Sequence, residues 1–346
     1  MRRNAFFLTG ALFATATIAF AQAPAQNEPD GTVPVTVANF TRAETDMYFS
    51  GFVKNGAFGK FNHIREPANI DKQDVIRMNR DTLYSQAIFD LDAGPVTITT
   101  PDAGTRFMSL MIIDEDHYVP MVFYGRGMHT LTKDEIGTRY VAAVVRTLVD
   151  PADPKDVQEV HALQHQIKVD QKSGGNFEVP NWDQVSQKKV RDALLVLSST
   201  MSTYQNAFGA KGKVDPITHL IGTASGWGGN PDKDAAYAAV IAPQNDGTSI
   251  YKINVKDVPV DGFWSVSVYN EAGYFEKNPY DAYSLNNITA KKDADGSITI
   301  QFGGCDGKIP NCIPITKGWN AAVRLYRPRD EILAGKWKFP DAQLVR

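Results

Sequence analysis

The sequence lacks any long apolar run after its first 21 residues, so no segment there reaches the roughly 20 apolar residues of a membrane-spanning helix. The apolar run over residues 5–20 is also short, and it follows a basic start and ends in the Ala-x-Ala motif at 19–21. This combination predicts a secretory signal peptide over residues 1–21, cleaved after Ala21. We therefore expect a mature protein in the periplasm or outside the cell, with no membrane span.

The sequence also lacks a strong charge of either sign, since its formal net charge is −3. Cleavage after residue 21 would remove Arg2 and Arg3 and no acid, which brings the net charge to −5. A mildly acidic chain gives no electrostatic basis for binding nucleic acid or an anionic membrane surface. We expect no nucleic-acid partner, and no sequence motif identifies a cofactor.

Cysteine is scarce: the 346 residues contain only Cys305 and Cys312. They flank a short loop rich in Gly and Pro, and an even pair in an exported protein predicts a disulfide. A metal site is the alternative, but no second pair of ligands stands nearby. We predict a Cys305–Cys312 disulfide that fixes the shape of the loop.

The alternation of strand and helix patterns predicts an α+β fold, mainly β, with two β-sandwich or jelly-roll-like domains joined by a helical segment. Strand patterns dominate residues 22–150, which we assign to an N-terminal β-rich domain. Helical patterns dominate residues 151–245, and strand patterns return over 246–346 as a C-terminal β-rich domain. The length of the chain agrees with two domains.

Several local patterns predict individual elements. Residues 106–113 are nearly all apolar, which is typical of a strand buried on both faces. A capping box at 41–44 predicts the start of one helix, and Asp153 and Asn181 are the predicted first residues of two others. Asn230, followed by a proline and two acids, predicts one more helix start.

The sequence DEDH at residues 114–117 directly follows the predicted buried strand. Asp114, Asp116 and His117 are candidate catalytic residues, because acids and a histidine at a strand end can bind a cation or act as an acid/base pair. Alternate residues of an extended chain share a face, so Asp114 could act with Asp116, or Glu115 with His117. The alternative is a solvated acidic turn with no chemistry.

A second group of polar and aromatic residues comes from both predicted domains. Aromatic rings beside Arg, Asp and Asn suit a sugar or another polar small molecule, but they suit a domain interface equally well. In the interface interpretation, neighbouring Arg80 and Asp81 form a buried ion pair. The candidate ligand-binding residues are Asn79, Arg80, Asp81, Tyr84, Trp264 and Tyr283.

Motifs in both halves of the chain resemble those of bacterial exported proteins that pair two domains of unknown function, DUF1254 and DUF1214. The first half carries NRDTLYS at 79–85, GPV at 94–96 and PDAG at 101–104, and the second carries GFWS at 262–265, NPY at 278–280, YS at 283–284, RLY at 324–326 and GKW at 335–337. The resemblance spans nearly the whole mature chain. It implies two β-rich domains with helices between or beside them.

These patterns support two functions. The first is an exported protein that binds a polar small molecule or a cell-envelope component, with no catalytic motif of its own, and that forms a homo-oligomer through its β domains. The second is an exported hydrolase or lyase acting on a polar small molecule or a cell-wall glycan fragment. A single concave pocket lined by the Arg80–Asp81 region and residues 114–117 would favour the enzyme.

Overall fold

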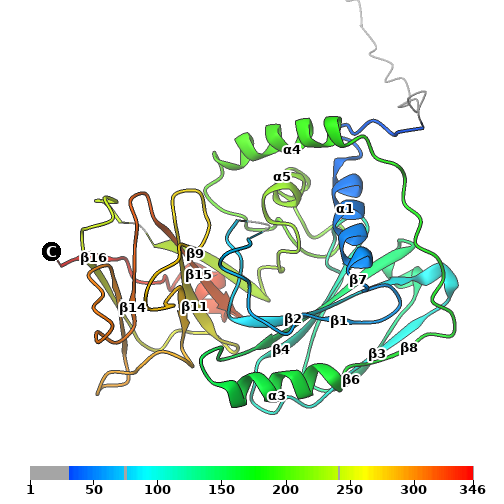
Figure 1. Cartoon of the computed structure of the whole chain (residues 1–346). Helices are drawn as coiled ribbons and strands as arrows, with labels where there is room; N and C mark the ends of the chain where they lie inside the picture. Colours follow the sequence, from blue (N-terminus) through cyan, green and yellow to red (C-terminus); the bar gives the residue numbers. More distant parts are fainter. Residues whose placement is uncertain (1–30, 74–75, 241, 346) are drawn as a thin grey trace, which may run out of the picture.

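The computed structural model describes residues 31–73, 76–240 and 242–345, so the signal peptide expected over 1–21 lies outside the described residues. The fold is α+β and mainly β, as predicted. Two lobes lie side by side, with the N-terminal lobe on the right of Figure 1 and the C-terminal lobe on the left.

The strands are β1 (Asn62–His63), β2 (Thr82–Asp90), β3 (Val96–Thr100), β4 (Met108–Asp114), β5 (Met121–Tyr124), β6 (Gly127–Leu131), β7 (Tyr140–Leu148), β8 (Lys168–Asp170), β9 (Ala235–Val240), β10 (Tyr251–Val255), β11 (Trp264–Tyr269), β12 (Ser284–Asn286), β13 (Ile298–Phe302), β14 (Cys312–Ile313), β15 (Asn320–Tyr326) and β16 (Gln343–Leu344). The helices are α1 (Phe40–Lys54), α2 (Lys133–Ile136), α3 (Pro154–His165), α4 (Gln184–Ser198), α5 (Pro216–Gly226), α6 (Asp330–Leu333) and the 3-10 turn η1 (Leu91–Ala93).

The N-terminal lobe is built on an antiparallel sheet in the order β1-β2-β7-β4-β5. Every residue of β4 and β7 is buried, so the prediction of a strand buried on both faces is confirmed. Leu110 and Ile112 pack toward the second sheet, β6-β3-β8. Met111 and Ile113 point to the opposite face, where Phe49 of α1 covers them.

Helices α1, α4 and α5 pack together above this sheet, while α3 lies below it (Figure 1). The predicted capping box is wrong: Thr41 lies inside α1, which begins after Asn39. Glu44, expected to cap, is instead buried against α4, where it forms an ion pair with Arg191 at 2.5 Å and accepts a hydrogen bond from Gln187 at 2.9 Å. The carboxylate of Glu44 thus binds two residues of α4 instead of capping the end of α1, which the local sequence pattern had predicted.

The C-terminal lobe consists of two four-stranded sheets, β14-β13-β10-β16 and β12-β11-β15-β9, which enclose one apolar core. All strand pairs are antiparallel except β13 with β14. Trp264 and Val266 of β11 point into this core, and Ile300 and Phe302 of β13 meet them from the other sheet. Because side chains alternate along a strand, Ser265, Ser267 and Tyr269 of β11 face the N-terminal lobe.

The segment expected to be helical over 151–245 is divided between the lobes. Asp153 caps α3 as predicted, whereas α4 is capped by Asp183 and not by Asn181. The helix predicted after Asn230 is wrong, because the chain makes one turn there and enters β9, which pairs with β15. None of the helices within the described ranges has the length and apolar character needed to cross a bilayer.

Candidate functional site

The turn after β4 holds the four residues predicted as a candidate site, and their side chains mostly stabilise the turn itself. Asp114 accepts hydrogen bonds from the backbone N–H groups of Asp116 and Tyr118 at 2.9 and 2.8 Å. Glu115 accepts one from the backbone of Tyr140 at 2.8 Å. Both carboxylates are buried, so the interpretation as a solvated turn is wrong.

His117 is fully enclosed, and it is the residue of the turn with a left-handed backbone, at φ 62°. Its Nε2 accepts the backbone N–H of Gly228 at 2.8 Å, so the ring proton sits on Nδ1 and is donated to the hydroxyl of Thr223 at 2.8 Å. Burial and the neighbouring His219 hold the pKa of His117 well below its usual range. A neutral, doubly hydrogen-bonded, enclosed imidazole is a core residue.

His117 is also the middle ring of a stack of five aromatic side chains. Its centroid lies 5.6 Å from that of His219 and 5.4 Å from that of Trp227. The stack continues from His219 to Tyr118 at 4.6 Å and from Trp227 to Tyr48 at 4.3 Å, with near-parallel rings at both ends. The stack joins α1, the β4 turn and α5, so His117 ties three elements of the lobe together.

Four carboxylates and one guanidinium meet where α1 crosses the β4 turn. Arg42 contacts Asp116 at 2.7 Å and Glu115 at 3.7 Å. Burial, with a smaller contribution from the nearby acids, raises the pKa of both Asp46 and Asp114 to about 7. Across the described residues, no group of three or more His, Cys, Asp or Glu side chains is arranged to hold a metal ion.

Between the two lobes, the N-terminal sheet presents a row of polar residues. Tyr84, Arg146, Ser109 and Tyr124 stand opposite one another across β2, β7, β4 and β5. Arg146 is 6% exposed and lies over the ring of Tyr84 at 5.4 Å. It donates to the carbonyl of Gly228 at 2.9 Å. The row forms the end of the sheet that faces the C-terminal lobe.

The C-terminal lobe presents a similar row of polar residues across β12, β11, β15 and β9: Asn286, Ser265, Arg324 and Tyr237. Arg324 is also 6% exposed, and it donates to the hydroxyl of Tyr269 at 2.9 Å and to a carbonyl of the segment preceding β2 at 2.8 Å. Two buried arginines, one from each lobe, therefore occupy the centre of the interface.

Asp81 is a buried carboxylate that acts on the charge of Arg324. It is 2% exposed, and burial raises its pKa while Arg324 has the largest opposing effect, followed by Ser265 and Asn286. Its Oδ2 has no hydrogen-bond partner within the described chain. Asp81 thus balances part of the charge of Arg324 without forming a direct ion pair with it.

The predicted ligand-binding residues are only partly brought together. Asn79 lies in the centre, where its amide donates to the hydroxyl of Tyr326 at 2.9 Å. The predicted Arg80–Asp81 ion pair is wrong: Arg80 is half-buried, donates to the carbonyl of Ala68 and lies 5.3 Å from the ring of Tyr283.

Trp264 points away from the interface into the core of the C-terminal lobe, where its ring lies 5.6 Å from that of Phe339. Sequence reasoning missed Arg146 as a member of the interface. The signal was present, because Arg146 is the one charged residue in the otherwise apolar or neutral strand β7. A charge inside a strand buried on both faces requires a specific environment.

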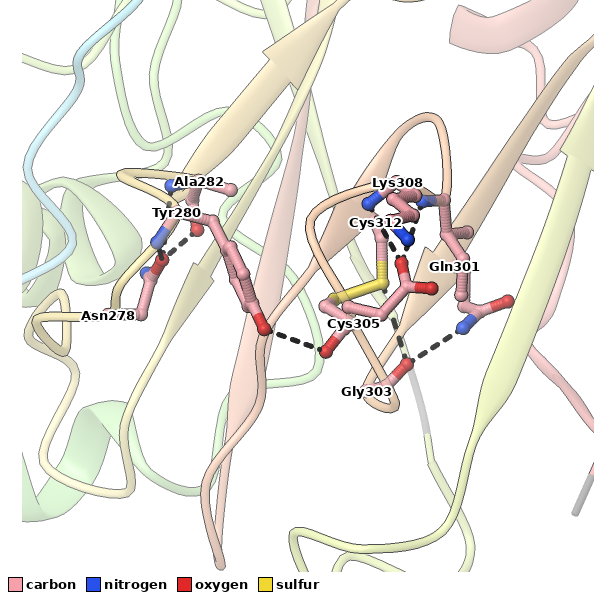
Figure 2. Close-up of a disulfide and its surroundings, with 10 residues drawn as sticks. Asn278, Tyr280, Ala282, Gln301, Gly303, Cys305, Lys308 and Cys312 are labelled. Atoms are coloured by element: carbon pink, nitrogen blue, oxygen red, sulfur yellow. Dashed lines mark hydrogen bonds between the residues drawn. A yellow bond between two sulfur atoms is a disulfide. The ribbon is translucent and has the colours of Figure 1, made fainter.

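The predicted disulfide is confirmed, with an S–S distance of 2.06 Å between Cys305 and Cys312. Figure 2 shows this bond closing the loop between β13 and β14, with the ring of Tyr280 pointing toward the loop. The hydroxyl of Tyr280 donates to the carbonyl of Cys305 at 3.1 Å. This contact joins the loop to the segment that precedes β12.

A cavity of about 310 Å³ lies beside the disulfide loop. It is lined on one side by the segment from Tyr280 to Thr289 and on the other by residues of the loop from Cys305 to Ile313. A volume of roughly 300 Å³ or more is typical of a small-molecule site. Tyr280 is 43% exposed at this cavity, so part of its ring is available for contact.

Comparison with known proteins identifies two family matches, both described as proteins of unknown function: DUF1254 over residues 58–126 and DUF1214 over residues 239–330. The fold is similar to the crystal structure of the VPA0106 protein from Vibrio parahaemolyticus (TM-score 0.65, 20% identity, 89% of this chain and 98% of that chain). It is also similar to an uncharacterized protein from Burkholderia cenocepacia (TM-score 0.52, 14% identity, 90% and 87%).

A comparison with curated proteins found no match. At these identities the two crystal structures show a shared fold alone. The family matches fall in the N-terminal and C-terminal halves predicted from the sequence motifs. The chain therefore carries a match to DUF1254 in its N-terminal half and a match to DUF1214 in its C-terminal half.

Proposed function

We propose that this is an exported binding protein, and that it takes a polar small molecule or a cell-envelope fragment into the cavity beside the disulfide loop. The observation that carries the proposal is the cavity of about 310 Å³ with a half-exposed tyrosine ring at Tyr280. A neutral sugar, such as an N-acetylated one, is the ligand class that fits best, because sugars present an apolar face to an aromatic ring and hydroxyls to the rest of a site.

The lining of the cavity supports this ligand class. Ser284 and Thr289 offer hydroxyl groups, and Leu285 and Ile309 offer apolar contact. No charged side chain lines the cavity, which favours a neutral ligand over an ionic one.

The cavity is also held in shape before any ligand arrives. The disulfide fixes one wall, and the hydroxyl of Tyr280 anchors the other wall to the carbonyl of Cys305. The side-chain amide of Asn311 adds two more hydrogen bonds, to the carbonyls of Lys291 at 2.7 Å and Thr299 at 3.0 Å. A pre-organised site loses less conformational entropy on binding, which favours affinity.

A binding role is preferred over a hydrolase or lyase because the acids and the histidine that suggested chemistry have other roles. Asp114 and Glu115 hold backbone groups, and His117 is enclosed in the core. These residues lie in the N-terminal lobe, whereas the cavity lies in the C-terminal lobe beside β14.

The binding proposal is tested by isothermal titration calorimetry with N-acetylglucosamine and diacetylchitobiose. We expect the disaccharide to bind and Tyr280→Ala to weaken it about tenfold, because ring stacking is worth about 1 kcal/mol or more. Tyr274→Ala, at a half-buried tyrosine outside the cavity, is the matched control and should leave binding unchanged. Failure of both sugars to bind the wild-type protein would contradict the proposal.

Export is tested separately. The disulfide supports an oxidising compartment, where such bonds persist. Mass spectrometry of protein isolated from its native host should find Gln22 as the first residue, in open or cyclised form. Recovery of a chain that still begins at Met1 would contradict cleavage after Ala21.

A further inference from the structure

The lobe interface contains two buried guanidinium groups, and neither has an ion pair within the described residues. Arg146 and Arg324 are each 6% exposed, and no carboxylate oxygen of the described chain lies within 4.0 Å of their nitrogen atoms. Burying a cation without a partner costs several kcal/mol. Two such cations in one cluster also repel each other, so the arrangement requires an explanation.

The two arginines differ in how their charge is balanced. Arg324 has Asp81 close enough to raise its pKa, so a negative charge of the protein compensates it in part. No carboxylate is among the groups that act most strongly on Arg146, and the buried Asp234 instead accepts a hydrogen bond from Tyr124 of the same row at 2.9 Å. Its hydrogen bonds go to neutral acceptors only: the carbonyl of Gly228 at 2.9 Å, Oδ1 of Asn230 at 3.4 Å and the sulfur of Met111 at 3.6 Å.

The titratable groups that act most strongly on the charge of Arg146 are phenols. Tyr84 and Tyr326 are the two that influence its charge most, followed by Tyr237 of the opposite lobe. Burial raises the pKa of Tyr84, but the adjacent Arg146 lowers it, and the net shift is downward. These phenols can each donate a proton and carry no negative charge at their ordinary pKa, and the downward shift of the Tyr84 pKa reflects surroundings that favour a negative charge beside Arg146.

We propose that this cluster is a binding site for a small organic acid, whose carboxylate pairs with Arg146 between Tyr84 and Tyr326. A planar carboxylate matches the fork of a guanidinium and can accept two parallel hydrogen bonds from it. The hydroxyl groups of the two tyrosines and the amide of Asn79, which already donates to Tyr326 at 2.9 Å, supply further donors.

The site has an exposed border. Tyr237 is 48% exposed, and Tyr84 and Asn79 are half-buried, so one side of the cluster reaches solvent. This site is distinct from the cavity beside the disulfide, which is lined by no charged side chain. The two proposals therefore make separate predictions, since one site takes neutral sugars and the other takes acids.

Isothermal titration calorimetry in low-salt buffer tests the site by comparing the binding of three carboxylates with that of the corresponding uncharged amides: acetate with acetamide, succinate with succinamide, and benzoate with benzamide. We expect at least one acid to bind the wild-type protein, and its amide to bind at least about tenfold more weakly, as for the loss of a hydrogen-bonded charge. Equal binding of acid and amide, or no binding of any acid, would overturn the proposal. This comparison needs no variant and so does not depend on folding.

The same titrations with variants then identify where on the protein the acid binds. Arg146→Gln should weaken acid binding about tenfold or more, and Arg146→Lys, which keeps the charge but loses the fork, should also weaken it. Arg327→Gln is the control, because Arg327 is an exposed arginine beside Tyr124 at the same interface. Full acid binding by folded Arg146→Gln would overturn the assignment, whereas Tyr280→Ala should leave acid binding unchanged.

Discussion

Replacing His117 by Ala should destabilise the protein strongly. The imidazole is fully enclosed between two other rings of the five-ring stack, at 5.6 Å from His219 and 5.4 Å from Trp227. Truncating a buried ring to Ala costs about 3–5 kcal/mol, through lost contacts and the remaining cavity. The N–H of Gly228 also loses its acceptor, so we expect the upper part of this range.

Urea denaturation followed by circular dichroism measures this change. His117→Phe separates the two contributions, because it keeps the ring and loses both hydrogen bonds, and it should cost about 1–3 kcal/mol. His165→Ala, at an exposed histidine of α3, is the matched control and should change the free energy of unfolding by no more than about 0.5 kcal/mol. A loss below about 1 kcal/mol for His117→Ala would refute its assignment to the core.

Two further predictions concern buried carboxylates. The folded pKa values of Asp46 and Asp114, about 7, lie above their unfolded values, so the folded state binds protons more tightly. The free energy of unfolding should therefore rise by about 1–2 kcal/mol as the pH is lowered from 8.5 to 6.5. Below pH 6.5 the buried neutral histidines oppose this trend. A free energy of unfolding that stays constant or decreases as the pH is lowered over this window would contradict the prediction. Arg191→Ala should cost about 2–4 kcal/mol in urea titrations, since it leaves Glu44 buried and unpaired, whereas Lys188→Ala, in an exposed pair, should cost no more than about 0.5 kcal/mol. Equal losses for the two variants would show that the Glu44 pair is no stronger than a surface pair.

The parts of the fold that local pattern alone determines could be predicted. The apolar run over 106–113 predicted a strand buried on both faces, and β4 is such a strand. The disulfide followed from two cysteines flanking a short Gly-rich loop. In both cases the deciding interactions lie within or next to the segment that carries the pattern.

Predictions failed where a distant partner overrides local preference. Residues 235–239 read AAYAA, which favours a helix, and the preceding turn carries residues typical of a helix start. The segment is nevertheless the strand β9, because pairing with β15 completes the edge of a sheet. The capping box failed for the same reason, since Arg191 of a distant helix takes the carboxylate of Glu44.

The candidate site could be predicted only in part. Arg80 and Asp81 do not pair, because each has a distant partner: Arg80 donates to the carbonyl of Ala68, and Asp81 faces Arg324 of the other lobe. His117 looked like a loop residue from its sequence position, and only the packing of α1 and α5 onto the turn makes it a core residue. Arg146 and Arg324 are 178 positions apart in the sequence, so their convergence depends on how the lobes meet.

A crystal structure of the protein with diacetylchitobiose tests the central claim most directly. We expect the sugar in the cavity beside the Cys305–Cys312 loop, with one ring stacked against Tyr280 and the disulfide intact. A sugar bound at another place on the molecule, or an empty cavity at saturating sugar, would contradict the proposed sugar site.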